Sequence, residues 1–207
     1  MRSIVVVSLL GLLSACNHTS PAVSMDAPAK KYRAKDYASV LKRWTRQKRI
    51  IKELDTPLKV HATLFSPDFR QAYIARYAKM FALPKDKRLA LAEKFEKEWR
   101  DSYAVILVAA THDTSWNDFD RKNSIWRVIL LDDQGRQVQA KTVVRARRNT
   151  ATLKTLFPQL DDFYQFYRLT FPKSAADGQP LLRGDAKSVS LKIAGPLGIA
   201  KLVWRLK

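Results

Sequence analysis

The feature that most constrains the fold is a series of strand-like segments in the second half of the chain. Six segments have strand length and composition: residues 104–111, 125–131, 138–144, 164–171, 188–193 and 200–206. The second and third of these flank Asp132-Asp133-Gln134-Gly135, a sequence typical of a hairpin turn. Apolar and polar side chains alternate in residues 188–193, and Ala200, Leu202, Trp204 and Leu206 share one face of the last segment, which is typical of strands with one buried face.

The first half of the chain predicts one more strand and two helices. Residues 58–65 are rich in strand formers. Ser66 and Pro67 then have the residue types of a helix cap and a first helical turn, and this helix is expected to reach about residue 82. Leu83-Pro84 interrupts it, because the residue before proline avoids the helical region. A second helix is expected over residues 85–100.

Residues 30–52 are predicted to form a basic amphipathic helix that ends before Pro57. Its apolar side chains fall at helical spacing: Tyr37, Val40, Leu41, Trp44 and Ile51. Its cations face outward and are candidates for contact with an anionic surface: Lys30, Lys31, Arg33, Lys35, Lys42, Arg43, Arg46, Lys48 and Arg49. The aromatic side chains of this segment fit either a membrane interface or the protein core, and for Trp44 we favour the core.

These elements predict an α+β fold. The strands follow one another mostly in hairpin order without regular helices between them, which favours an antiparallel β-sandwich, immunoglobulin-like in general architecture, over a parallel sheet. Two or three helices near the N-terminus would pack on one face or end. We expect one globular domain over residues 30–207, with a helical part (30–101) and a β-rich part (103–207).

The N-terminus has the pattern of an export signal. Arg2 precedes an apolar run over residues 4–13, which is shorter than the roughly 20 residues that a membrane-spanning helix needs. The run ends in Leu13-Ser14-Ala15-Cys16, and Cys16 is the single cysteine of the chain. This motif resembles the lipobox of bacterial lipoproteins, in which a leucine and two small residues precede the modified cysteine.

The resemblance implies that residues 1–15 are a signal peptide and that Cys16 carries a diacylglycerol on its sulfur. Two or more acyl chains hold a protein firmly in a bilayer. By the sorting pattern of enterobacterial lipoproteins, Asn17 in place of aspartate implies the outer membrane, with the domain on its periplasmic side. Residues 16–29 are rich in small and polar types and are predicted to be a flexible tether.

Residues 103–207 are also similar, in their order of motifs, to uncharacterised lipoproteins of delta-proteobacterial type. The shared order is a W-x-V-like strand, a D-x-G hairpin, a Tyr-x-Phe strand that ends in proline, and a final hairpin with the pattern S-x-x-L…G-P-x-G…W. The resemblance implies a β-sandwich. It implies no activity and no functional residue.

The formal charge of +19 fits two interpretations, a solvated surface that keeps the protein soluble and an attraction to an anionic partner. Lipid headgroups, lipopolysaccharide and acidic envelope proteins are the candidates for an exported protein. Nucleic acid is disfavoured, because a lipoprotein meets little of it and the sequence holds none of its recognition motifs.

The best candidate for a chemical site is the segment from His112 to Asp120. Asp113, Asp118 and Asp120, with Asn117, offer oxygen ligands of the kind that hard cations prefer, but the spacing of an EF-hand is absent. An inter-strand turn in which these residues bond their own backbone explains the same composition. The sequence has no nucleophile elbow, zinc-protease motif or glycine-rich phosphate loop, and it predicts neither a cofactor nor an enzyme.

Three functional hypotheses follow. The first is a membrane-anchored binding or assembly module whose basic surface faces lipid, lipopolysaccharide or an acidic protein. The second is a subunit of a larger envelope complex for secretion or motility. The third is a hydrolase or metal-dependent enzyme that uses the His112–Asp120 segment.

Overall fold

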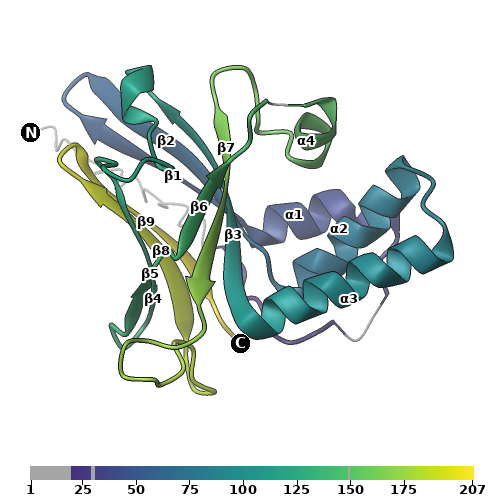
Figure 1. The fold of residues 1–207 in the computed structure, drawn as a ribbon. Helices are drawn as coiled ribbons and strands as arrows, with labels where there is room; N and C mark the ends of the chain where they lie inside the picture. The colour runs from purple at the N-terminus through teal and green to yellow at the C-terminus, as the bar shows by residue number, and fades with distance from the viewer. Residues whose placement is uncertain (1–19, 29–30, 149) are drawn as a thin grey trace, which may run out of the picture.

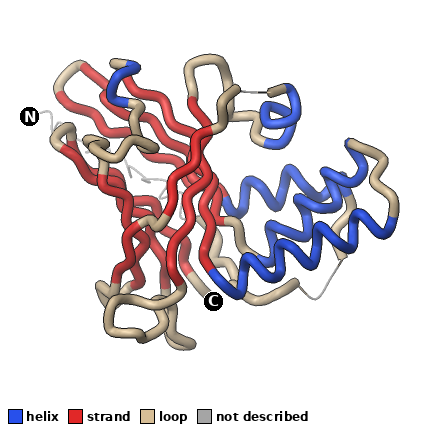
Figure 2. Tube along the Cα trace, in the orientation of Figure 1, coloured by secondary structure: helices blue, strands red, loops and turns tan. Residues whose placement is uncertain are grey.

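The chain folds into two antiparallel β-sheets packed face to face, with helices against one of them (Figures 1 and 2). The computed structural model describes residues 20–28, 31–148 and 150–207. The five-stranded sheet has the order β1-β2-β3-β7-β6, and the four-stranded sheet has the order β5-β4-β8-β9. The predicted α+β sandwich is therefore confirmed.

The strands of the five-stranded sheet are β1 (Thr45–Lys52), β2 (Asp55–Leu64), β3 (Ser102–Thr111), β6 (Thr142–Arg145) and β7 (Gln165–Pro172). Those of the four-stranded sheet are β4 (Arg127–Asp132), β5 (Gln137–Gln139), β8 (Ser188–Gly195) and β9 (Gly198–Arg205). The helices are α1 (Tyr37–Trp44), α2 (Pro67–Met80), α3 (Lys85–Asp101) and α4 (Ala151–Leu156), with 3-10 turns η1 (Ala34–Asp36) and η2 (Thr114–Trp116).

The prediction of one helix over residues 30–52 was wrong in its second half. The helix ends at Trp44, and residues from Thr45 onward form β1, which pairs with β2 around a turn at Glu53 and Leu54. Helical spacing holds as far as Trp44, which is buried as predicted, but Ile51 is 71% exposed and its neighbour Ile50 is buried instead. Pairing with β2 thus overrides the local helical pattern.

The single strand predicted over residues 138–144 is two strands in different sheets. β5 pairs with β4, whereas β6 pairs with β7, and the chain crosses between the sheets at Ala140 and Lys141. With β1 separate as well, the described part of the chain has nine strands rather than seven.

The helices between β2 and β3 match the prediction closely. The Ser66 hydroxyl accepts a hydrogen bond from the Phe69 amide, Pro67 opens α2, and α3 follows from Lys85. Arg70 of α2 is buried and donates to the carbonyl oxygens of Phe65 and Phe95, which joins α2 to the end of β2 and to α3. The sequence pattern did not predict α4, which begins where the Thr150 hydroxyl accepts from Leu153.

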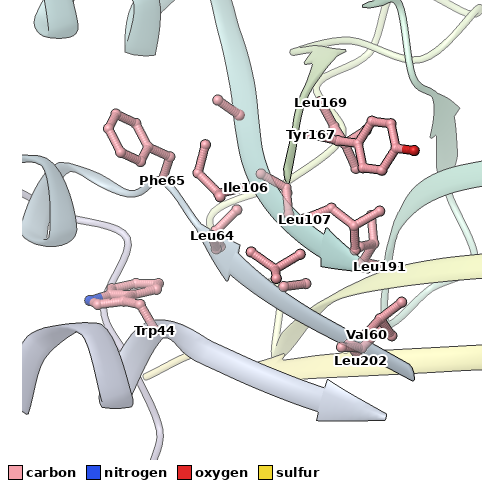
Figure 3. Packing of buried hydrophobic residues seen from close by; sticks show 14 of the residues in the cluster. Trp44, Val60, Leu64, Phe65, Ile106, Leu107, Tyr167, Leu169, Leu191 and Leu202 are labelled. Carbon is pink, nitrogen blue, oxygen red and sulfur yellow. The ribbon is translucent and has the colours of Figure 1, made fainter. Parts of the chain in front are cut away.

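The hydrophobic core lies between the sheets and continues under the helices. Figure 3 shows side chains from both sheets pointing into this space, among them Val60 and Leu107 from one sheet and Leu191 and Leu202 from the other. Every residue of β3 from Tyr103 to Ala109 is buried, because helices cover the outer face of this central strand. This explains its continuous apolar run.

Strands β1 and β9, each at the edge of its sheet, meet along one side of the sandwich. The Trp204 indole N–H donates to the Trp44 carbonyl oxygen at 2.8 Å, and the Arg46 Nε donates to the Val203 carbonyl oxygen at 2.8 Å. The first bond joins β9 to the end of α1, and the second occupies a backbone carbonyl at the β9 edge, which limits its availability to another chain.

Candidate functional site

The predicted basic residues divide into exposed and structural groups. Lys31, Arg33, Lys35 and Lys42 are exposed before and on α1, and Lys48 and Arg49 are exposed on β1. Lys30 lies outside the described residues, as do the lipobox residues Leu13, Ser14, Ala15 and Cys16. No single helix gathers the cations, so the helical basic surface predicted from sequence is not present in that form.

Two of the predicted surface cations are tied into the fold. Arg43 is half-buried and contacts the Tyr32 hydroxyl at 3.2 Å and the Asp68 carboxylate at 3.7 Å. Arg46 is only 8% exposed and also donates to the carbonyl oxygens of Arg43 and Thr45. Burial lowers the pKa of Arg46. The assignment of Arg46 to an anionic surface was therefore wrong, because its guanidinium joins β1 to β9.

The segment from His112 to Asp120 closes one end of the sandwich. The side-chain amide of Asn117 donates to the Ala109 carbonyl oxygen. The backbone and side-chain oxygens of Asn117 accept from the Tyr167 hydroxyl. Phe119 stacks on Trp126 in the core. The segment connects β3 of one sheet to β4 of the other, and the buried residues hold that crossing.

The carboxylates predicted as metal ligands make local bonds instead. Asp113 caps η2 by accepting from the Ser115 amide, and hydrogen bonds from the side chain and then the backbone of Ser115 lower the pKa of its carboxyl. Asp118 accepts from the Ser124 hydroxyl and the Ile125 amide. Asp120 is exposed. Among the described residues, no group of three or more His, Cys, Asp or Glu side chains is placed to hold a metal ion. The geometry therefore favours the turn interpretation over a metal site.

The outer face of the four-stranded sheet carries the most distinctive surface chemistry. We call it the sheet face and define it by four cations and four aliphatic side chains at outward positions of β4, β8 and β9: Arg127, Lys192, Lys201, Arg205, Ile129, Leu131, Ile199 and Val203. Ile199 is 60% exposed and Val203 is 37% exposed. Helices α1 to α4 all lie on the side of the other sheet, so none covers this face (Figure 1).

Acidic side chains do not balance these cations. The outward positions of β4, β5, β8 and β9, all of them described, hold no Asp or Glu. None of the four cations makes an ion pair with an acid in the described ranges. Lys192 and Lys201 are direct cross-strand partners, and like charges so placed destabilise a sheet. An anionic surface would relieve that repulsion.

Val23, in the described residues 20–28, is fixed beside this sheet. Val23 is buried, its amide donates to the Arg205 carbonyl oxygen at 2.9 Å, and its own carbonyl oxygen accepts from the Lys207 amide at 3.1 Å. Val23 lies next to Leu206 as a parallel bridge. Residues 16–29 were predicted to be a flexible tether. Residues 16–19 and 29 lie outside the described residues, and within the rest Val23 is held against the end of β9 instead.

Sequence reasoning missed the sheet face as a site. The inward residues of β9 predict a strand, and its outward residues play no part in that prediction. The available signal was the alternation of aliphatic and basic side chains at Ile199, Lys201, Val203 and Arg205.

Comparisons with known proteins give no family. No family model, no curated protein and no solved structure matches the chain. Within the described ranges, no helix combines the length and the apolar character needed to cross a bilayer.

Proposed function

We propose that this protein is a non-enzymatic lipoprotein of the bacterial envelope whose sheet face rests on an anionic membrane surface. The observation that carries the proposal is the sheet face itself, which combines cations and exposed aliphatic side chains and, in the described part of the chain, has no acids at its outward positions. Basic and apolar side chains on one face are the combination that binds membrane interfaces.

The predicted anchor would hold this face near the bilayer. Cys16 precedes Val23 by seven residues, which span at most about 25 Å when fully extended. Val23 is fixed to the C-terminal end of β9, so a lipid on Cys16 would keep that strand within this reach of the membrane. Lys187, Arg205 and Lys207 are exposed near the same end. Asn17, the residue directly after Cys16, favours sorting of the lipoprotein to the outer membrane.

The cations of the sheet face are expected to contribute appreciably to the free energy of membrane binding. Each Lys or Arg near an anionic leaflet contributes about 1 kcal/mol at moderate salt. The attraction fades within a Debye length of about 10 Å at 0.1 M salt. We assign the face to lipid rather than to an acidic protein because the tether delivers it to the bilayer and because its aliphatic side chains can enter the headgroup region.

Vesicle binding tests the proposal. The full chain carrying Cys16→Ser is mixed with vesicles of phosphatidylglycerol and phosphatidylcholine at several salt concentrations. Replacing Arg127, Lys192, Lys201 and Arg205 by Gln should weaken binding by at least about tenfold at low salt. A matched variant with Gln at Lys85, Lys87, Lys94 and Lys97, all exposed on α3, removes the same charge and should bind nearly as wild type.

Two results would contradict the lipid assignment. Equal losses in the two variants would show that only net charge matters. Absence of vesicle binding by the wild type, with retained affinity for an acidic envelope protein, would favour the protein partner instead.

The anchor has a separate test. Incorporation of labelled fatty acid by the wild type should disappear in Cys16→Ser. If the wild type takes up no label, the lipoprotein assignment is wrong. The vesicle experiment would then be the one remaining test of membrane contact.

A further inference from the structure

A basic pocket lies on the opposite side of the molecule from the sheet face. It has a volume of about 380 Å³ and is formed by β1, β2 and the residues just before β7. Its walls include Gln47, Arg49, Lys59, His61 and Tyr164. The first four point outward from the five-stranded sheet, beyond the region that α2 and α3 cover.

These four outward side chains form a two-by-two array. Gln47 is the cross-strand partner of His61, and Arg49 is the cross-strand partner of Lys59. Arg49 and Lys59 therefore stand directly opposite each other with the same charge, an arrangement that destabilises a strand pair. Neither makes an ion pair with an acid within the described residues. Lys48 also borders the pocket, but it is the cross-strand partner of the inward-facing Val60, so its side chain belongs to the other face of the sheet and is not part of the array.

His61 and Tyr164 form the more enclosed wall. Their ring centroids lie 5.7 Å apart. His61 is half-buried, and burial together with the charge of Arg49 lowers its pKa, while Asp161 opposes that shift. A neutral imidazole at this position can donate one hydrogen bond into the pocket, as can the Gln47 amide.

We propose that this pocket binds a phosphate group carried by a small organic molecule or a lipid headgroup. A phosphate dianion would compensate the facing charges of Arg49 and Lys59, and a guanidinium binds phosphate oxygens with two parallel hydrogen bonds. Gln47 and His61 donate to the remaining oxygens, and the Tyr164 ring packs against the organic part. The inference does not rest on the proposed function, because it concerns the other sheet and needs no lipid on Cys16.

Thermal unfolding and NMR of the full chain test the inference with inorganic phosphate as the probe. Phosphate at constant ionic strength should raise the melting temperature and shift the His61 imidazole resonances. The double variant Arg49→Gln/Lys59→Gln should bind phosphate at least about tenfold more weakly. Without phosphate it should melt no lower than the wild type, because the repulsion between the strands is gone. The matched variant Lys94→Gln/Lys97→Gln should bind as the wild type does.

The phosphate experiments can support or overturn the proposed phosphate site. Unchanged His61 resonances on addition of phosphate, or equal losses in the two double variants, would overturn the inference. If phosphate binds, glycerol 3-phosphate and vesicles that contain phosphatidic acid distinguish the source of the group. Tighter binding of the soluble ester indicates a small metabolite, and tighter binding of the vesicle indicates a headgroup.

Discussion

Arg46 and Lys48 lie two positions apart on β1, but their side chains meet different surroundings. The Arg46 guanidinium donates to three backbone carbonyl oxygens and lies over the Trp204 ring, 5.9 Å from its centroid. Lys48 is exposed. The sequence therefore shows only that both residues are cations. Their different roles depend on the contact between β1 and β9.

Arg46→Gln should lower the free energy of unfolding by about 2 to 3 kcal/mol, because buried carbonyl oxygens lose charged donors. Vesicle binding by the folded fraction should not change. Lys48→Gln is the matched control and should leave stability within about 0.5 kcal/mol of wild type. Urea unfolding measures both, and equal stability of the two variants would contradict the role given to Arg46.

His61 should make stability depend on pH. Its pKa in the folded protein is lowered by burial and by Arg49, with Asp161 as the opposing charge and the Tyr164 ring beside it. As the pH falls through about 6.5, the ordinary value, the unfolded chain takes up a proton at His61 before the folded protein does. The unfolded state is thereby favoured, and the free energy of unfolding falls.

Comparing wild type with His61→Gln isolates this contribution. Urea unfolding in phosphate-free buffer at pH 7.5, 6.5 and 5.5 should show a smaller loss of stability on acidification in the variant. The same loss in both proteins would mean that other groups account for the pH dependence.

At the scale of elements, the sequence predicted those whose signals are local. The Ser66 cap, the Pro84 break and the Asp132–Gly135 turn each depend on neighbouring residues, and α2, α3 and the β4–β5 hairpin formed as expected. The start of β1 and the division of residues 138–144 depend instead on distant partners. Helical spacing and strand spacing both fit the residues around Trp44, and only pairing with β2 selects the strand.

The β8–β9 turn brings Gly198 against β1. Gly198 has φ +132°, and a Cβ built there would lie 2.7 Å from Ile50 Cγ2. Gly198→Ala should therefore destabilise the fold by about 1 to 3 kcal/mol through backbone strain and steric overlap. Gly184→Ala, where a Cβ meets nothing within 4 Å, is the control and should be close to neutral. Thermal unfolding of the two variants measures the difference, and equal melting temperatures would contradict close packing of this turn on β1.

At the scale of the whole molecule, the sandwich gives each sheet one outward surface, and the two differ. Helices cover much of the five-stranded sheet and leave the basic pocket at its open end, whereas helices α1 to α4 do not cover the sheet face (Figure 1). Composition predicted a basic protein but not where its charge is uncompensated. That distribution depends on which strands pair and which face each strand turns outward, so it requires the tertiary structure.

The central claim is that the sheet face contacts the membrane. Spin labels at Ile199→Cys on the sheet face and at Leu89→Cys on α3 test it in the Cys16→Ser background, because both side chains are exposed. On vesicles containing phosphatidylglycerol, collisions of the label with a water-soluble nickel chelate should fall at position 199 and persist at position 89. Equal accessibility at the two positions, or protection at position 89 alone, would contradict the proposed orientation.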